Sequence, residues 1–251
     1  MTSTRVQLCG RFVVDVEGRR LEGAFPGRQG RLLFAYLALN RDRPVPRSEL
    51  VEALWSSELP RDPSDALAAV LSKLRAAVGN HHIEGRSEIT LVLPPDAHVD
   101  VERAIASAHE AESACSLGDW HRAWGASLCT QTIGRRTLLG DYEAAWIDAW
   151  RRTLDDARLR ALECYGRACL ELGGTELAAA ERAAREVIRL APLRESAYGL
   201  LMESLEASGN VAEALLVYEE LRQKLREELG IAPTELAQAE YRRLLGAPAR
   251  G

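Results

Sequence analysis

The sequence has no long apolar run, no secretory leader pattern and few cysteines. No stretch approaches the roughly 20 apolar residues that a membrane-spanning helix needs, and residues 1–10 have no apolar core behind a basic head. The five cysteines of this 251-residue chain form no C-x-x-C pair and none of the spacings that hold zinc. We therefore expect a globular protein of the cytoplasm with reduced thiols and no contact with a membrane.

Motifs of catalysis are also missing. Neither the G-x-x-x-x-G-K-[ST] phosphate loop nor a G-x-G-x-x-G turn after a strand occurs in the sequence. A nucleophile needs a base within reach, and none of the five histidines accompanies a Ser or Cys in a recognisable motif. The adjacent His81 and His82 have no third ligand at metal-binding spacing, so they are typical of solvated loop side chains. The sequence thus predicts no enzyme, no cofactor and no metal site.

The net charge of −5 argues against a nucleic-acid binder when it is taken alone. Its distribution changes that judgement. Residues 1–98 contain 13 Lys+Arg and 12 Asp+Glu, whereas residues 99–251 contain 19 and 25. The acidity therefore belongs to the second part of the chain, and the first part is close to neutral.

The first part of the chain mixes short strand-forming segments with helical ones. Residues rich in strand formers and separated by turns predict strands at 5–9, 12–16, 83–84 and 89–93. Apolar residues at helical spacing predict helices at 28–39, 47–55 and 64–78. Ser64 is the expected N-cap of the last helix and Gly79 its end. Helix, loop, second helix and hairpin, in that order, are the layout of a winged helix-turn-helix.

The helix predicted at 64–78 would enter the DNA major groove in such a fold. Its inward side holds Leu67, Leu71 and Leu74. The candidate DNA-facing residues are Ser64, Asp65, Ala69, Ser72, Lys73 and Ala76, with Ala68 and Arg75 on the flank. This side is poor in base-reading groups, because a carboxylate can accept from cytosine and an alanine can contact only the thymine methyl group.

Basic side chains around this helix are candidates for phosphate contacts, since phosphate neutralisation supplies most non-specific DNA affinity. They are Arg47, Arg61, Lys73, Arg75 and Arg86. Arg86 occupies the expected hairpin tip, which suits a phosphate or minor-groove contact. Five scattered cations on a near-neutral domain are equally typical of ordinary surface charge, so their convergence in space would decide the matter.

From Val99 onward the pattern is helical. In three segments a Gly at a helix exit is followed five residues later by an Ala that we expect to pack closely against a neighbouring helix. They are Gly118–Ala123, Gly173–Ala178 and Gly209–Ala214. The last two are 36 residues apart, near the period of tetratricopeptide-type helix pairs. Residues 141–172 predict one long helix or two with a kink. We expect a mainly α chain, with a winged helix-turn-helix domain at 1–98 and an all-α, tetratricopeptide-like domain at 99–251.

Both parts resemble the Streptomyces antibiotic regulatory protein family. The residues that resemble its winged-helix domain are Arg31–Leu39, Val45–Trp55 and Leu71–Arg75, and those that resemble its bacterial transcriptional activator domain are Ala191–Glu195, Gly209–Tyr218 and Glu227–Pro233. The resemblance implies an activator that binds promoter repeats on double-stranded DNA and recruits RNA polymerase through sigma-factor contacts. Where such proteins usually have Asn, Gln and Arg on the recognition helix, this chain has Asp65, Ala68 and Ala76.

Three functions remain open from the sequence. We favour a DNA-binding transcriptional regulator whose helical domain contacts RNA polymerase or forms a homodimer. The altered face of the helix at 64–78 also fits a protein-interaction adaptor with a degenerate winged helix, in which both domains bind proteins. A small-molecule sensor would leave no trace that the sequence reveals.

Overall fold

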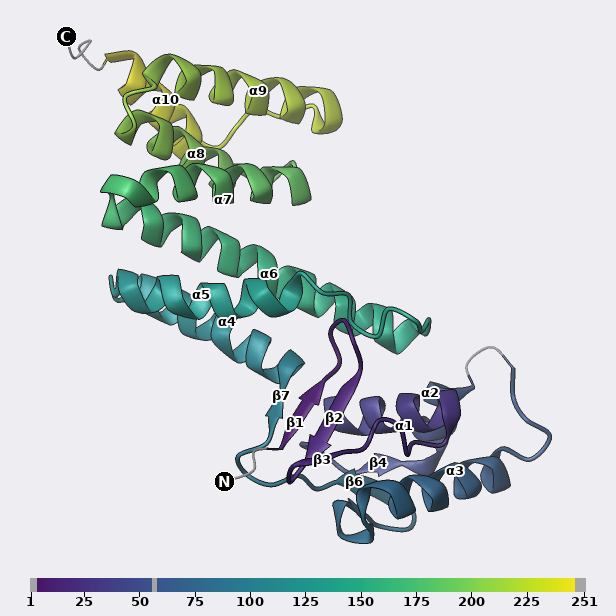
Figure 1. Ribbon diagram of the computed structural model, residues 1–251. Helices are drawn as coiled ribbons and strands as arrows, with labels where there is room; N and C mark the ends of the chain where they lie inside the picture. The colour runs from purple at the N-terminus through teal and green to yellow at the C-terminus, as the bar shows by residue number, and fades with distance from the viewer. Residues whose placement is uncertain (1–3, 56–57, 247–251) are drawn as a thin grey trace. The chain divides into compact units, whose positions relative to one another are not determined.

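The computed structural model describes residues 4–55 and 58–246 (Figure 1). The helices are α1 (Gly27–Leu39), α2 (Arg47–Leu54), α3 (Pro63–Val78), α4 (Asp100–Ser116), α5 (Trp120–Gly134), α6 (Ala145–Leu172), α7 (Leu177–Leu190), α8 (Glu195–Ala207), α9 (Val211–Leu229) and α10 (Glu235–Gly246), with short 3-10 turns η1 (Asn80–His82) and η2 (Gly174–Glu176). The strands are β1 (Arg5–Gln7), β2 (Val13–Val16), β3 (Arg19–Arg20), β4 (Val45–Pro46), β5 (Ile83–Glu84), β6 (Glu88–Leu91) and β7 (His98–Val99). The fold is mainly helical with small sheets, as predicted.

The chain divides into two compact units. The first unit contains residues 1–105 and 133–154, and the second unit contains residues 106–132 and 155–251. Helices α4, α5 and α6 therefore contribute residues to both units. The predicted domain boundary between residues 98 and 99 stays a prediction.

One sheet of the first unit joins the start of the chain to the start of α4. β1 pairs with β2 in antiparallel and with β7 in parallel orientation, and Val6 lies opposite Val14 on one side and Val99 on the other. The three valines are buried, which fixes the register because a one-residue slip would turn them to the other face. The strand β7 and its parallel pairing were not predicted from the sequence.

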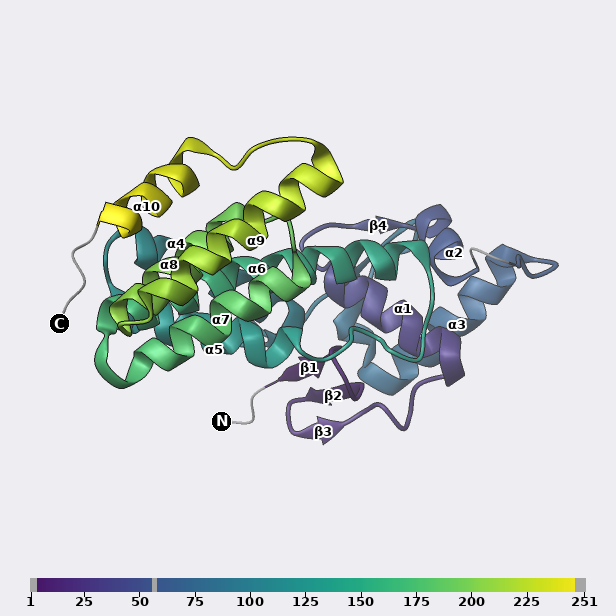
Figure 2. The same ribbon diagram turned by 90° about the horizontal axis from the view of Figure 1, so that it is seen from above.

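The second sheet joins the hairpin to α2. β6 pairs with β5 and with β4, and Val45 lies opposite Ile89. Strand β4, which was not predicted, leads directly into α2 and ties the start of that helix to the hairpin. Helices α1, α2 and α3 contact one another and lie close together in Figure 2. Helix α1 also contacts β6, and α2 contacts β4.

The core of the first unit includes residues far along the chain. Leu138 and Ile147 are fully buried in it. The Trp146 ring packs edge-on against Tyr36 at a centroid distance of 5.0 Å, and its Nε1 donates to the Ala53 carbonyl at 3.1 Å. The sequence predicted a helical segment at 141–172 but not its packing partners, so the inclusion of residues 133–154 in the first unit was not foreseen.

In the second unit, α7 packs on α8 and α8 on α9, and Figure 1 shows the three stacked side by side. The long segment before them is one helix, α6, that begins at Ala145 rather than at residue 141. Tyr198, Leu205 and Leu221 are fully buried between these helices.

The Gly-to-Ala pattern of the second unit corresponds to a repeated helix boundary, but in one of the three segments the buried alanine lies two residues later than predicted. Gly118, Gly173 and Gly209 all have φ between +69° and +82°, where glycine is favoured. Ala123 and Ala214 are fully buried, as expected for close packing. The prediction for Ala178 was wrong, because it is exposed. The turn η2 delays the start of α7 by two residues, so its fourth residue, the fully buried Ala180, takes the equivalent position.

The five cysteines are free thiols. Burial raises the pKa of Cys164 to about 12 and that of Cys169 to about 11. Among the helices that the structure describes, none is long and apolar enough to cross a membrane.

Candidate nucleic-acid interface

Helix α3 begins with a cap that differs from the predicted one. Asp62 precedes the helix, and its Oδ1 accepts from the Asp65 amide at 3.0 Å. Pro63 takes the first helical position, where its missing N–H costs nothing. Ser64 therefore lies within the first turn and is not the N-cap. The helix ends before Gly79, at φ +103°, as predicted.

The two sides of α3 differ in burial as the sequence predicted. Leu67, Leu71 and Leu74 are at most 1% exposed and lie in the core of the first unit. The exposed residues of α3 are Ser64, Asp65, Ala68, Ala69, Ser72, Lys73 and Ala76. The side chains of this outward face are short and mostly uncharged. Lys73 is the one basic residue among the seven exposed residues of α3.

Arg75 does not project freely from α3. Its Nε donates to the Ile83 carbonyl at 3.1 Å and its Nη2 to the Gly85 carbonyl at 2.7 Å. The guanidinium therefore fixes the β5–β6 hairpin against the helix. The turn itself requires glycine, because Gly85 has φ +91° and a Cβ there would lie 1.8 Å from the Glu88 carbonyl oxygen.

Arg47 reaches the same turn from the other side. Its backbone amide donates to the Ser87 carbonyl at 3.2 Å, and its Nη2 lies 3.5 Å from the Ser64 carbonyl oxygen at the start of α3. The hairpin turn that holds Arg86 thus lies between Arg47 and Arg75. We call this region, together with the exposed residues of α3, the α3–hairpin surface.

The start of α2, which positions Arg47, is itself held by a polar network. The Glu49 carboxylate accepts from the Tyr36 hydroxyl at 2.5 Å and from Arg43 Nη1 at 3.0 Å. The hydrogen bond from Arg43 lowers the pKa of Glu49, while burial and the Glu49 carboxylate raise the pKa of Tyr36 to about 12. At neutral pH the Glu49 carboxylate is therefore ionised and can accept, and the Tyr36 hydroxyl is protonated and can donate.

The remaining predicted cations are exposed. Within residues 4–55 and 58–246, no hydrogen bond or ion pair involves the side chains of Arg61, Lys73 or Arg86. Arg61 lies in the loop before α3. Within the described residues, no hydrogen bond connects its side chain to the elements that hold the other four cations. Asp65 on α3 and Glu88 on β6 are exposed as well, so the helix and hairpin carry charges of both signs.

The prediction that both adjacent histidines are solvated was wrong for one of them. His81 is exposed, but His82 is only 4% exposed and its Nδ1 lies 2.8 Å from the Val92 carbonyl oxygen. The turn η1 directs the second ring inward, where it anchors the segment after the hairpin. The described residues contain no group of three side chains that could hold a metal ion.

Comparison with known proteins identifies the family. The model of a family described as the bacterial transcriptional activator domain matches residues 99–245, which is more than half of the chain. The chain belongs to this family. It is similar to members of the Streptomyces antibiotic regulatory protein family, as its sequence motifs indicated.

Curated relatives of this family member include two Streptomyces regulators. Regulatory protein AfsR of Streptomyces griseus is 33% identical over 220 residues, which cover 85% of this chain and 22% of AfsR. Regulatory protein DnrI of Streptomyces peucetius is 26% identical over 219 residues, covering 82% of this chain and 80% of DnrI. The chain thus spans about a fifth of the AfsR length, given the 22% coverage.

A solved structure has the same fold. Mycobacterium tuberculosis EmbR, in complex with a low-affinity phosphopeptide, superimposes with a TM-score of 0.82 over 97% of this chain and 64% of that chain. The two sequences are 21% identical in this comparison, so the likeness concerns the fold.

Proposed function

We propose that this regulator activates transcription by binding promoter DNA through a winged helix-turn-helix formed by residues 1–98. Helix α3 enters the major groove and the β5–β6 hairpin is the wing that contacts the adjacent backbone. Residues 99–251 form a tetratricopeptide-like domain that contacts RNA polymerase through its sigma factor or forms a homodimer.

The α3–hairpin surface is the observation that supports DNA binding. A helix with one exposed side lies beside a hairpin, and Arg75 holds the two together through hydrogen bonds of 3.1 and 2.7 Å. A fixed spacing between helix and hairpin is what simultaneous contact with a groove and a phosphate strand requires. The surface also gathers Arg47, Arg75 and Arg86 at one turn.

Two cations of this surface, Lys73 and Arg86, are available for phosphate. In the first unit, other arginines are neutralised by carboxylates, such as Arg41 by Glu102 at 2.6 Å and Arg43 by Glu49 at 2.5 Å. No ion pair within the described residues involves the side chain of Lys73 or Arg86. A cation without a carboxylate partner can contact a phosphate without first breaking an ion pair.

The base-reading groups of α3 are few, and we propose a role for each kind. Lys73 can donate to guanine, Asp65 can accept from the cytosine amino group, and the exposed alanines Ala68, Ala69 and Ala76 can contact thymine methyl groups. The serines Ser64 and Ser72 suit phosphate or base contacts. With so few direct contacts, sequence-dependent DNA shape contributes to the choice of site.

The two lysines of the chain, Lys73 and Lys224, allow a test of this proposal, since one lies on the α3–hairpin surface and the other serves as a control. We expect Lys73→Ala to weaken binding to DNA from upstream of the protein's own gene and to reduce the slope of log affinity against log salt by about 1. Lys224→Ala, on α9, is the matched control and should change neither quantity. Bound DNA should also slow acetylation of Lys73 while leaving that of Lys224 unchanged, as read by mass spectrometry.

The adaptor function predicts different results in the same experiments. The small, uncharged character of Ala68, Ala69 and Ala76 favours it, since such a face can pack against a protein. An adaptor would give no salt-dependent DNA binding, and Lys73 and Lys224 would then be acetylated at rates that DNA does not alter. That outcome would refute DNA binding by this surface.

A further inference from the structure

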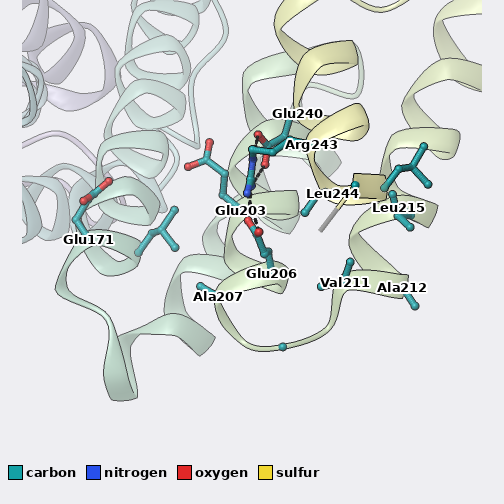
Figure 3. A pocket seen from close by; sticks show the side chains of 14 residues that line it. Glu171, Glu203, Glu206, Ala207, Val211, Ala212, Leu215, Glu240, Arg243 and Leu244 are labelled. Carbon is teal, nitrogen blue, oxygen red and sulfur yellow. Dashed lines mark hydrogen bonds and ion pairs between the residues drawn. The ribbon is translucent and has the colours of Figure 1, made fainter. Parts of the chain in front are cut away.

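A groove in the second unit lies between α6, α8, α9 and α10 (Figure 3). Its volume is about 1350 Å³, and it opens to solvent. Apolar lining comes from every one of these helices, through Leu170, Ala207, Val211, Leu215 and Leu244. Pockets for small molecules usually measure about 300–1,000 Å³ and enclose most of the ligand, so this groove suits a larger occupant.

Carboxylates accompany this apolar surface. Glu171, Glu203, Glu206 and Glu240 line the groove together with a single basic side chain, Arg243. Figure 3 shows Arg243 between Glu206 and Glu240, to which it donates at 2.7 Å and 2.6 Å. The cation of the groove is therefore held by two of its own carboxylates, and the lining keeps an excess of negative charge.

The carboxylates retain capacity for a further cation. Arg167 pairs with Glu203 but lies 3.8 Å from Glu171, at the limit of an ion pair. Each carboxylate offers about four lone-pair sites, more than one arginine occupies. Glu171 is exposed, so a cation brought by an occupant could reach it while Arg167 keeps its closer pair with Glu203.

We propose that this groove binds an amphipathic helix of a partner protein that places arginine or lysine along the edge of its apolar face. Leucine-type side chains would contact Val211, Leu215 and the exposed Leu245, in the manner of a helix in a hydrophobic groove. The basic edge is required because an entirely apolar helix would remove the carboxylates from water without compensation. Nucleic acid is disfavoured, since its phosphates would meet the same carboxylates. The proposal goes beyond DNA binding and does not depend on it.

The full chain and a defined probe test the proposal. The probe is a fluorescein-labelled peptide of about 15 residues with leucine at i, i+3, i+4 and i+7 and arginine at the flanking positions. We expect saturable binding by fluorescence anisotropy, and no binding of a matched peptide in which glutamate replaces arginine. Absence of saturable binding of the arginine peptide at about 100 µM protein, a concentration that detects even weak complexes, would overturn the proposal.

Variants inside and outside the groove locate the binding. Ala212→Arg blocks the groove from an exposed position on α9, and Glu171→Lys reverses a charge; each should weaken binding at least about fivefold. Leu216→Arg and Glu220→Lys, on exposed positions of the same helix α9 outside the lining, should stay within about twofold of the unaltered chain. Circular dichroism establishes that each variant is folded.

Two outcomes would refute the assignment. Equal binding by Ala212→Arg and the unaltered chain would place the peptide elsewhere. If sedimentation showed that the unaltered chain forms a dimer and Ala212→Arg does not, the occupant would be a second copy rather than a basic helix.

Discussion

Cutting the chain after residue 98 should leave an N-terminal fragment that does not fold on its own. The fragment loses Leu138, Leu139, Ile147 and Leu154, which are at most 5% exposed in the core of the first unit. Burial of a large apolar side chain stabilises by about 1.5–3 kcal/mol, so these four account for about 6–12 kcal/mol as an upper estimate. Whole domains have stabilities of about 5–15 kcal/mol.

The same cut removes hydrogen bonds that hold β1. The Asp100 carboxylate accepts from the amides of Leu8 and Cys9 at 3.0 and 2.9 Å. Without it, two backbone groups of a part-buried segment lose their partner, at about 1–3 kcal/mol each if they stay dry. The total, about 8–18 kcal/mol, is as large as the whole stability of a typical domain, so little is left to hold the shorter fragment folded.

Urea unfolding of two fragments, followed by circular dichroism, measures the effect. We expect residues 1–154 to unfold in one cooperative transition and residues 1–98 to show none. In the full chain, Ile147→Ala should cost about 2–5 kcal/mol if its side chain belongs to this core. A cooperative transition of 1–98 with the midpoint of 1–154 would refute the reasoning and make residue 98 the end of an independent folding unit.

Three further predictions concern single groups. Arg75→Ala should lower the free energy of unfolding by about 1–3 kcal/mol, because the hydrogen bonds to the hairpin are lost. Lys73→Ala, on the same helix, should lower it by less than about 0.5 kcal/mol. Equal values for the two variants in urea titrations would contradict the bridging role of Arg75. If the exposed alanines of α3 contact thymine methyl groups, uracil in place of thymine should weaken DNA binding by about 0.5–1 kcal/mol per contact, and unchanged anisotropy titrations would argue against such contacts. The hydrogen bond from Arg20 holds the pKa of Glu22 at about 2, below the 4.5 of the free side chain. Glu22 thus stabilises the fold above pH 4.5 and loses this effect as the pH falls toward 2, so the unaltered chain should lose stability faster than Glu22→Gln over that interval; parallel acid-unfolding curves would contradict it.

The helices of the first unit could be read directly from the sequence because their signals are local. On α3, apolar residues at spacings of three and four place Leu67, Leu71 and Leu74 on one side, and these side chains are buried. Gly79 ends the helix because its φ of +103° is unfavourable for other residues. Such features depend on neighbours within one or two turns.

Displacements of one or two residues along a helix could not be predicted from the sequence, and the reason is also physical. Ser64 and Asp62 are both good N-caps, and only the position of Pro63 at the start of the helix selects Asp62. The buried alanine of α7 is Ala180 instead of Ala178 because η2 precedes that helix. A pattern of residue types does not reveal whether a 3-10 turn delays a helix.

Contacts between distant segments could not be predicted at all. The hydrogen bond from Trp146 to Ala53 joins residues 93 positions apart, and no local signal marks either as a partner of the other. Arg75 is a related case over a shorter stretch of chain, because its type made it a candidate for phosphate contact and its guanidinium binds carbonyls eight and ten residues further on. The residue type indicated that Arg75 would donate hydrogen bonds, and only the tertiary structure showed which groups accept them.

The net charge of −5 is a poor guide to the α3–hairpin surface because the excess of acidic residues belongs to residues 99–251, whereas residues 1–98 are close to neutral. At physiological salt, exposed charges beyond about 8 Å are largely screened, so an approaching duplex responds to the charges of the surface it meets. The salt dependence of DNA binding should therefore follow the cations around α3 and its hairpin, and substitutions that change the net charge through the second unit alone should leave it unaltered.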